Sequence, residues 1–489
     1  MKKKLFEIID DSHSIVKQGN ANVEINSLQF DSRMVKEGDV YFAIKGFAQD
    51  GHQYIPQAIE NGAIAVVVED YNPNVIKGVQ QVVVSDNTRK ALAFAADRFY
   101  NSPSRDIKLV GVTGTNGKTT IATMLFQLFT DLGFKVGLIS TVENKIGEDI
   151  IPSTHTTPDV ISLNRLIREM VNAGCEYAFM EVSSHAVDQD RIYKVDFKGG
   201  VFTNMSHDHL DYHNTFKEYI WAKKKFFDAL SSEAFALVNT DDKRGEVMLQ
   251  NTAAQKLTYA LKRMADYKAK ILSNHVNGLF LTIDGHEAHF RMVGEFNAYN
   301  ILAVYGVARE FGFSPSEILL KLSNLKGAEG RFEIVKADGV NKMGIVDYAH
   351  TPDALENVLT TIDKTKEGKI QIVTVVGCGG DRDKTKRPKM AQIASKYSDR
   401  FILTSDNPRT ENPESILDDM EEGLNLSDKS RMLRIADRKQ AIRAAVQLSK
   451  PGDIILVAGK GHEKYQDING EKLPFDDKKV LAEALAASI

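Results

Sequence analysis

The sequence predicts an α/β protein built from three domains. Its 489 residues exceed the roughly 250–300 that one hydrophobic core usually serves. Strands alternate with amphipathic helices in two long stretches, one after Asp106 and one after Arg331, as expected for parallel sheets covered by helices. A polar stretch with a proline at 101–104 suits a linker after a smaller first part. We therefore expect domains at 1–103, 104–329 and 330–489.

The first domain is expected to be a small mixed α/β unit. Its short strand-like runs lie at 23–30, at 39–46, around Ile64 and at 79–85, and a helical stretch from 88 to 100 follows them. The last domain should be Rossmann-like, because helical segments separate strand candidates at 344–349, 370–377, 400–406 and 453–460.

The central domain should hold a mostly parallel, phosphate-loop type of sheet with helices on both faces. A strand and turn at 107–114 precede a helix at 119–132, and further strands are expected at 135–140, 178–184 and 199–204. The stretch 269–294 is hairpin-like, because Asn277-Gly278 and Asp284-Gly285 are turn dipeptides.

Composition narrows the class of protein. Hydrophobic residues make up 43%, charged residues 26%, and the formal net charge is −4, which indicates neither a nucleic-acid nor an anionic-membrane partner. The only two cysteines, Cys175 and Cys378, lie far apart, so a disulfide scaffold or structural zinc site is not expected. The N-terminal residues lack the apolar stretch of a signal peptide, and no run approaches the roughly 20 apolar residues of a membrane span. We expect a cytoplasmic protein without membrane insertion.

The most specific local signal is the glycine-rich segment GVTGTNGKT at 111–119. It follows a strand and opens a helix, as a phosphate-binding loop requires. Backbone N–H groups at the helix N-terminus favour bound phosphate, Lys118 would reach the terminal phosphates, and the Thr119 hydroxyl would coordinate Mg²⁺. The strict GxxxxGK[ST] spacing is not met, because it would need glycine where Val112 stands. The loop alone implies a nucleotide and no particular reaction.

The segment TGTNGKTT resembles the ATP loop of the Mur ligase family, which includes the folylpolyglutamate synthetases. Other motifs similar to those of the family cover almost the whole chain. The fit is best to the branch that adds the third residue of the peptidoglycan stem peptide. The motifs are DSR at 31–33, TTP at 156–158, MEVSSH at 180–185, TNMSHDHLDYH at 203–213, GEFNAYN at 294–300, GRFE at 330–333, DYAHTPDAL at 347–355, GCGGDRDKTKRP at 377–388, DNPR at 406–409 and AGKGHE at 458–463.

The resemblance implies an ATP site between the last two domains, which closure would shield from water. Polar groups at 239–242 and at Asn297 resemble positions near adenine, although capping a helix is the commoner role of such residues. The implied ATP-binding residues are Gly114, Thr115, Asn116, Gly117, Lys118, Thr119, Thr120, Asn300, Arg331 and Asp347.

The resemblance also implies a Mg²⁺ site. Glu181 and His209 follow strands and would join Thr119 as ligands, whereas His207 and His213 are interpreted as ordinary turn or surface histidines. Lys223 matches a lysine that the family carries as a CO₂ adduct. Alone, the lysine run would be interpreted as a solvated face, but a carbamate, formed from the neutral amine, would supply two anionic oxygens. The implied catalytic residues are Lys118, Lys223 and His209.

Two further sets of residues resemble substrate contacts of the family. An arginine can bind a carboxylate through two parallel hydrogen bonds, and Glu463 could hold an ammonium group. The alternative to a binding role for the DNPR segment is an Asn-Pro turn with a surface arginine. His155 departs from the asparagine common in related enzymes. Contacts to a UDP-sugar-peptide are implied for Ser32, Thr156, Thr157, Ser183, Gln189 and Arg191, and contacts to meso-diaminopimelate for Arg382, Asp406, Asn407, Pro408, Arg409, Gly459 and Glu463.

The function that the resemblance implies is an ATP-dependent ligase, a monomer, acting through an acyl-phosphate. It would add meso-diaminopimelate to UDP-N-acetylmuramoyl-L-alanyl-D-glutamate for peptidoglycan synthesis. An L-lysine-adding ligase and a folylpolyglutamate-type ligase are the alternatives within the fold. A nucleotide-binding switch is the alternative from another class, but it would need neither Lys223 nor a third domain with amino-acid-type charges.

Overall fold

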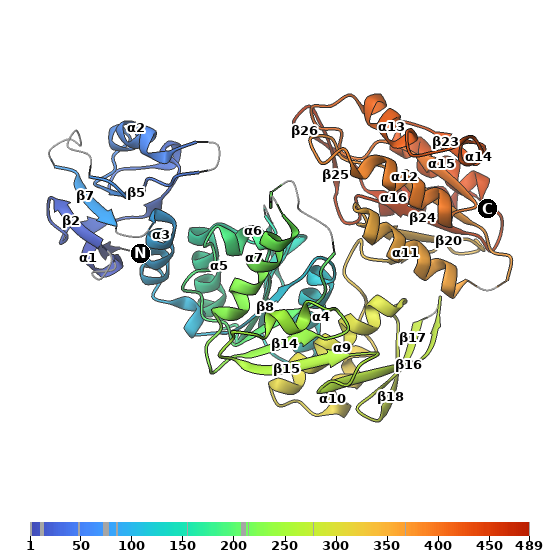
Figure 1. Cartoon of the computed structure of the whole chain (residues 1–489), viewed down its shortest axis with the longest axis horizontal. Coiled ribbons are helices and arrows are strands. Elements are labelled where there is room, and N and C mark those ends of the chain that lie inside the picture. The colour runs from blue at the N-terminus through green and yellow to red at the C-terminus, as the bar shows by residue number, and fades with distance from the viewer. Residues whose placement is uncertain are drawn as a thin grey trace.

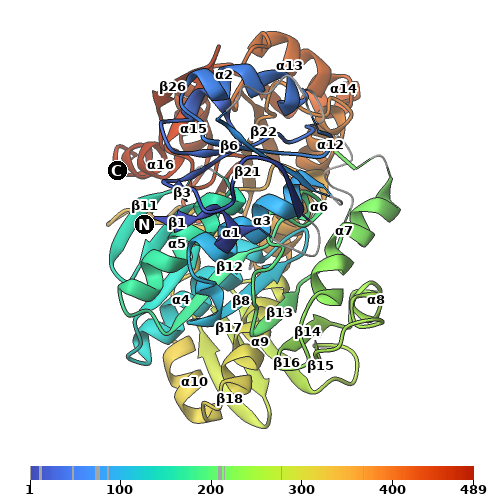
Figure 2. The same cartoon turned by 90° about the vertical axis from the view of Figure 1, so that its left-hand side faces the viewer.

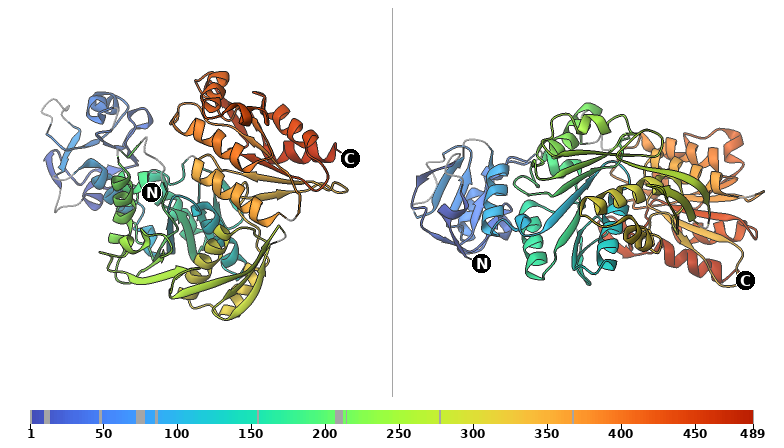
Figure 3. Two further views of the ribbon diagram at one scale, coloured as in Figure 1. Left: turned by 45° about the vertical axis from the view of Figure 1, so that its right-hand side comes forward. Right: turned by 90° about the horizontal axis from the view of Figure 1, so that it is seen from below.

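A computed structural model describes most of the chain. Figures 1 and 3 show a smaller N-terminal part at one end of a central part and a C-terminal part at the other end. Among the described residues, no helix is both long and apolar enough to cross a membrane. The described residues are 2–9, 14–46, 49–71, 78–84, 87–153, 155–206, 212–213, 215–276, 278–366 and 368–488.

The N-terminal part is a five-stranded mixed sheet. Its strands β4 to β7 are parallel and β2 is antiparallel. The stretch 23–30, expected as one strand, is two short strands, β3 and β4, which belong to different sheets because the chain turns at Asn26 to bond Gly38 and Glu37. In sheet order the strands are β2 (Ser14–Gln18), β7 (Gln80–Val84), β6 (Ala65–Val68), β5 (Val40–Phe42) and β4 (Leu28–Gln29), while β1 (Lys3–Lys4) pairs with β3 (Glu24–Ile25).

Short helices connect and cover this sheet. Helix α3 begins where the Asn87 side chain accepts the backbone N–H of Lys90, and it packs on the central part through α5. The N-terminal helices are α1 (Leu5–Ile8), α2 (Ile55–Glu60) and α3 (Thr88–Phe99), with 3₁₀ turns η1 (Ser32–Met34), η2 (Gly51–Tyr54) and η3 (Pro103–Arg105).

The central sheet has eleven strands and is mostly parallel, as expected. Strand β8 lies between β12 and β13, and seven neighbouring strands from β9 to β16 run parallel; the hairpin expected at 269–294 extends the sheet as β16, β17 and β18. In sheet order the strands are β11 (Asp149–Pro152), β10 (Glu143–Ile146), β9 (Val136–Ile139), β12 (Tyr177–Glu181), β8 (Lys108–Thr113), β13 (Gly199–Phe202), β14 (Phe235–Asn239), β15 (Gln255–Ala260), β16 (Tyr267–His275), β17 (Gly278–Ile283) and β18 (His286–Phe290).

Helices cover both faces of this sheet, because successive strand residues point to opposite sides. On β8, Val110 and Val112 pack with α4, α9 and α10, whereas Leu109 packs with α5 and α7. In Figure 2, helix α10 and β18 lie at the bottom of the molecule, below the N-terminal sheet. The central helices are α4 (Lys118–Asp131), α5 (Val160–Asn172), α6 (Ser184–Asp188), α7 (Phe216–Asp228), α8 (Gly245–Met248), α9 (Glu295–Glu310) and α10 (Pro315–Leu322).

The C-terminal part is a six-stranded sheet between two helical layers. Five strands are parallel and β19 is antiparallel. The strands are β19 (Glu333–Val335), β20 (Met343–Asp347), β24 (Ile454–Ala458), β21 (Ile372–Val376), β22 (Arg400–Leu403) and β23 (Met432–Arg434), and a separate hairpin joins β25 (Tyr465–Ile468) to β26 (Glu471–Pro474).

Helices α11, α12 and α13 pack on one face of this sheet, and α15 and α16 on the other. The expected fold class, an α/β protein with a Rossmann-like last part, is confirmed. The C-terminal helices are α11 (Pro352–Thr365), α12 (Lys386–Tyr397), α13 (Pro413–Glu421), α14 (Leu426–Lys429), α15 (Arg438–Leu448) and α16 (Asp477–Ala486).

Candidate active site

The phosphate loop links the end of β8 to the start of α4. Gly117 has φ +90°, a conformation that side chains other than glycine's rarely adopt. A Cβ atom on Gly114 would lie 1.9 Å from Thr203 Oγ1, so the loop approaches the segment after β13 too closely for any other residue. That segment braces the loop: Thr203 Oγ1 donates to Asn116 O at 2.6 Å, and Asn116 N donates to Asn204 Oδ1 at 3.0 Å.

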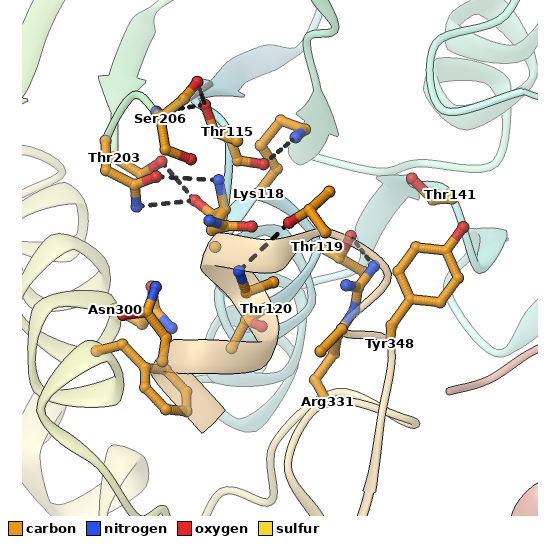
Figure 4. Close-up of a pocket in the computed structure, with 18 of the residues that line it drawn as sticks. Thr115, Lys118, Thr119, Thr120, Thr141, Thr203, Ser206, Asn300, Arg331 and Tyr348 are labelled. Atoms are coloured by element: carbon orange, nitrogen blue, oxygen red, sulfur yellow. Dashed lines mark hydrogen bonds between the residues drawn. The ribbon is translucent and has the colours of Figure 1, made fainter. Parts of the chain in front are cut away.

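Lys118 stands at the first turn of α4 and folds back over the loop. Its Nζ donates to Gly114 O at 3.0 Å and to Thr115 O at 2.9 Å (Figure 4). Residues from Thr115 to Thr120 line one large cleft, whereas Gly114 packs against the segment at Thr203 and does not line the cleft. The helix N-terminus and the lysine together form a region that attracts phosphate.

Arg331 reaches this loop from the segment that leads into the C-terminal sheet. Its Nη2 donates to Thr119 Oγ1 at 3.3 Å, and the guanidinium lies 4.3 Å from the centre of the Tyr348 ring (Figure 4). Asp347 accepts the backbone N–H of Phe332 at 2.6 Å. Burial raises the pKa of Asp347 to about 6, although the nearby Arg331 acts in the opposite direction.

The asparagines expected near adenine line the same cleft but also make internal hydrogen bonds. Asn300 Nδ2 donates to Asn297 Oδ1 at 3.0 Å, and Asn297 Nδ2 donates to Val293 O at 2.8 Å. Asn239 Nδ2 donates to Thr203 O at 2.9 Å. Helices α8 and α9 both begin without a side-chain cap, so the capping interpretation is wrong for these asparagines.

Glu181 and Lys223 lie beneath the phosphate loop. Glu181 ends β12, is buried, and accepts the Thr141 N–H on Oε1 at 2.7 Å. Lys223 on α7 is only 1% exposed, and its Nζ donates to Gly114 O at 2.9 Å and lies 4.7 Å from the centre of the Tyr219 ring. The solvated-face interpretation of this lysine run is therefore wrong at Lys223.

The oxygen ligands of this region suit Mg²⁺. Thr119 and Glu181 supply a hydroxyl and a carboxylate on the wall that also carries Lys223, and hard cations prefer oxygen ligands. His209, expected as a further ligand and catalytic residue, lies outside the described residues, as does His207. His213, interpreted as an ordinary turn or surface histidine, is instead buried against the rings of His185 and Tyr219. Within the described ranges, no group of three or more His, Cys, Asp or Glu is placed to hold a metal.

Two cavities bring the expected site residues together. The large cleft, of about 1560 Å³, joins the phosphate loop, Glu181 and Lys223 to residues of the C-terminal part. A second cavity, of about 690 Å³, lies between the N-terminal and central parts and is lined by Ser32 and Gln189. His155 and Arg191 line both cavities, so the two share a wall.

The residues expected to hold the UDP-sugar-peptide fall into two groups. Ser32 Oγ donates to Gln57 Oε1 at 2.7 Å, and Arg191 Nη2 donates to Gln189 Oε1 at 2.6 Å, on the wall of the second cavity. The remaining three lie in the large cleft and organise the end of β12. Thr156 accepts from Thr141 Oγ1, Thr157 donates to Glu181 O, and Ser183 caps α6 at Ala186 N.

The expected amino-acid residues gather where β22 and β24 end. Arg382, Arg409 and Glu463 line the large cleft, and Arg409 Nη1 donates to Gly380 O at 2.6 Å. The DNPR segment is not an exposed turn, because its first three residues are buried and support the arginine from behind. A Cβ on Gly459 would lie 2.5 Å from Asp406 Oδ2. Buried in the same region are Asp406, Asn407 and Pro408.

Family models match most of the chain. The "Mur ligase family, catalytic domain" matches residues 24–100, the "Mur ligase middle domain" residues 112–308, and the "Mur ligase, glutamate ligase domain" residues 330–461. The chain belongs to the Mur ligase family. This confirms both the resemblance and the expectation of a ligase.

Relatives within the Mur ligase family span the full chain. A UDP-N-acetylmuramoyl-L-alanyl-D-glutamate--2,6-diaminopimelate ligase of Parabacteroides distasonis is 53% identical and covers 98% of each chain. A protein of the same name from Cytophaga hutchinsonii is 52% identical over 96% of each. A solved structure with that name superposes with a TM-score of 0.70 at 32% identity and covers 100% of this chain and 99% of the other.

The sequence analysis assigns no role to several residues that the structure places at this Mur ligase site. Tyr348 stacks on Arg331, and its burial raises its pKa well above the usual range. The buried pair of Arg438 and Asp477 supports the segments that follow β22 and end β24, because Arg438 also donates to Ser405 O at 3.4 Å and to Ala458 O at 3.0 Å. Lys460 stands inside the AGKGHE motif, and its side chain is completely buried.

Proposed function

We propose that the chain is an ATP-dependent ligase that joins an amino group of meso-diaminopimelate to the side-chain carboxylate of UDP-N-acetylmuramoyl-L-alanyl-D-glutamate. One observation carries the proposal: a single cleft joins a phosphate loop to a cluster of two arginines and a glutamate, and it shares a wall with a second cavity. The names of the relatives, over nearly their full length, support the same pair of substrates.

In the first step the acceptor carboxylate attacks the γ-phosphate of ATP, which forms an acyl-phosphate and releases ADP. Lys118 and the N-terminus of α4 would hold the phosphates, and Arg331 would contribute a second cation from the opposite wall. Such fixed charges offset the negative charge that develops during phosphoryl transfer. The ATP site in this proposal comprises Gly114, Thr115, Asn116, Gly117, Lys118, Thr119, Thr120, Asn300, Arg331 and Asp347.

The proposal includes Mg²⁺ and a carbamate on Lys223. Thr119, Glu181, His209 and the carbamate oxygens of Lys223 would hold the ion. Bound there, Mg²⁺ would polarise phosphoryl oxygens and orient them. The support is the placement of Lys223, which is buried directly under the loop with its Nζ 2.9 Å from Gly114 O. A lysine needed only for solubility would not stand there, because burying an ammonium group is costly.

The acceptor would bind across both cavities. The uridine nucleotide would occupy the second cavity beside Ser32, and the dipeptide would pass Arg191 toward the phosphate loop. The free carboxylate would then reach the γ-phosphate while the nucleotide stays bound. Thr156, Thr157, Ser183 and Gln189 complete the proposed acceptor site.

The amino acid would bind from the C-terminal side of the cleft. Arg409 and Arg382 would bind the distal carboxylate that diaminopimelate has and lysine lacks, and Glu463 would hold an ammonium group. An amino group of the bound amino acid, after it has lost a proton, then attacks the acyl carbon of the acyl-phosphate, which forms the amide bond and releases phosphate.

Each of the three parts therefore receives one substrate. We propose that residues 1–103 bind the uridine nucleotide, 104–329 bind ATP and 330–489 bind the amino acid. Because the described residues of one chain line both cavities, the proposal includes a monomer, and it includes a cytoplasmic location.

ADP release tests the proposal. Purified protein, ATP and Mg²⁺ would be mixed with meso-diaminopimelate, L-lysine or L-glutamate, each with and without the UDP-dipeptide. We expect release only when diaminopimelate and the UDP-dipeptide are both present. Release of ADP with lysine would instead support a lysine-adding ligase. Release of ADP with glutamate, when a folate replaces the UDP-dipeptide, would support a folylpolyglutamate-type ligase. Release without any acceptor would contradict the proposal altogether.

A further inference from the structure

Lys460 is a fully buried lysine in the turn that follows β24. Its side chain is 0% exposed, and glycines flank it on both sides. A buried ammonium group is costly unless hydrogen-bonded and charged partners surround it. The partners of Lys460 therefore indicate why the chain keeps a lysine at this position.

Those partners are two residues of the amino-acid site. Lys460 Nζ donates to Asn407 Oδ1 at 2.8 Å and to Glu463 Oε2 at 3.0 Å. Asn407 Nδ2 donates to the same Glu463 oxygen at 2.7 Å, which closes a triangle of three side chains. The backbone N–H of Asp467 also donates to Asn407 Oδ1, at 2.9 Å. Because that oxygen receives two donors, the orientation of the Asn407 amide is fixed.

The triangle leaves one oxygen of Glu463 without a hydrogen-bond donor among the described residues. Glu463 Oε2 receives two hydrogen bonds, whereas no described residue donates to Oε1. Glu463 lines the cleft on the same side as Arg382 and Arg409. The result is one anionic acceptor beside two cationic donors, which matches an amino acid that presents an ammonium group and a carboxylate.

We propose that Lys460 is a positioning residue for amino-acid binding, which holds Asn407 and Glu463 Oε2 so that Oε1 accepts the ammonium group of the incoming amino acid. The inference rests on the proposed function and adds a residue to it. Lys460 acts through its two neighbours and does not touch the substrate. Its charge also balances that of Glu463 before the amino acid arrives.

The test is Lys460→Met, which keeps an unbranched side chain and removes the charge. We expect KM for meso-diaminopimelate to rise at least about tenfold, because Glu463 loses its orienting donor. KM for ATP and for the UDP-dipeptide should change less than about twofold. Lys396→Met is the matched control, because it removes an exposed ion pair with Glu356 in the same part of the chain and should leave all three values within about twofold.

A double-mutant cycle separates this role from a merely structural one. In a Glu463→Gln background, Lys460→Met should add less than about twofold to KM for the amino acid, because both changes affect one interaction. Fully multiplicative effects, or an equal rise in all three KM values, would overturn the proposal. If thermal unfolding shows that Lys460→Met does not fold, Lys460→Gln is tested in the same cycle. If the wild type uses another amino acid, only the proposed specificity fails, and the cycle is run with that amino acid.

Discussion

Replacing Asp477 with alanine should strongly destabilise the C-terminal part. Asp477 and Arg438 are both 0% exposed and form two parallel hydrogen bonds of 2.8 and 2.7 Å. Removing one member of such a pair leaves a buried charge without its partner, which costs about 3–5 kcal/mol. With a urea slope of roughly 2 kcal/mol per M, the unfolding midpoint should fall by about 1.5–2.5 M.

Hydrogen exchange of peptides from β24, measured across a urea series, would report this midpoint for the C-terminal part. The control is Asp418→Ala, which removes a side chain that is 67% exposed from its pair with Arg434 and should shift the midpoint by less than about 0.5 M. Arg438→Met combined with Asp477→Leu should recover part of the loss, because no charge is then buried. Equal midpoints for the two alanine variants would refute the reasoning.

Four further predictions concern the cleft. Lys118→Ala should lower the rate of ADP formation by about 10²-fold or more in a folded protein, and near-normal turnover would rule out the phosphate role. Lys223→Ala should be nearly inactive and partly rescued by short carboxylic acids, whereas full activity without them would exclude a ligand role. Arg409→Ala should reduce the preference in kcat/KM for diaminopimelate over lysine by roughly 10- to 100-fold, and an unchanged preference would contradict the assignment. The pKa of Asp347 is raised from 3.8 to about 6, so the folded protein binds a proton on this carboxyl more tightly than the unfolded chain does. The wild type should therefore lose about 3 kcal/mol of stability relative to Asp347→Asn as the pH rises from 4 through 6. Parallel curves of unfolding free energy against pH for the two proteins would disprove this.

Local pattern was enough to predict the phosphate loop. The strand, the glycine-rich turn and the helix are consecutive, and the helix begins at Lys118, one residue from the expected start. Such local features can be predicted from the sequence because a few consecutive residues determine their geometry. The close contact of Gly114 with Thr203 is different, because it depends on a segment about 90 residues away that the local pattern does not indicate.

Burial of charged residues was harder to predict. The lysine run 223–225 looks solvated, yet Lys223 and Lys224 are each 1% exposed, because Lys223 bonds the phosphate loop and Lys224 pairs with Asp228. Arg331 and Thr119 are 212 positions apart, and Asn407 and Lys460 are 53 apart. Such contacts depend on how the separate sheets dock, and no periodicity within a single element encodes that.

The wall shared by the two cavities has a consequence for how the acceptor is selected. His155 and Arg191 line both spaces, so under the proposed function the acceptor would be held by its nucleotide in one cavity and would present its carboxylate in the other. Such a tether raises the local concentration of the reactive end only when the linker has the right span. The protein would thus select acceptors by length, because the position of the bound nucleotide determines how far the carboxylate extends toward the phosphate loop. An acceptor longer or shorter by one amino acid could bind as tightly and still react slowly, because binding and reach are decided in different cavities.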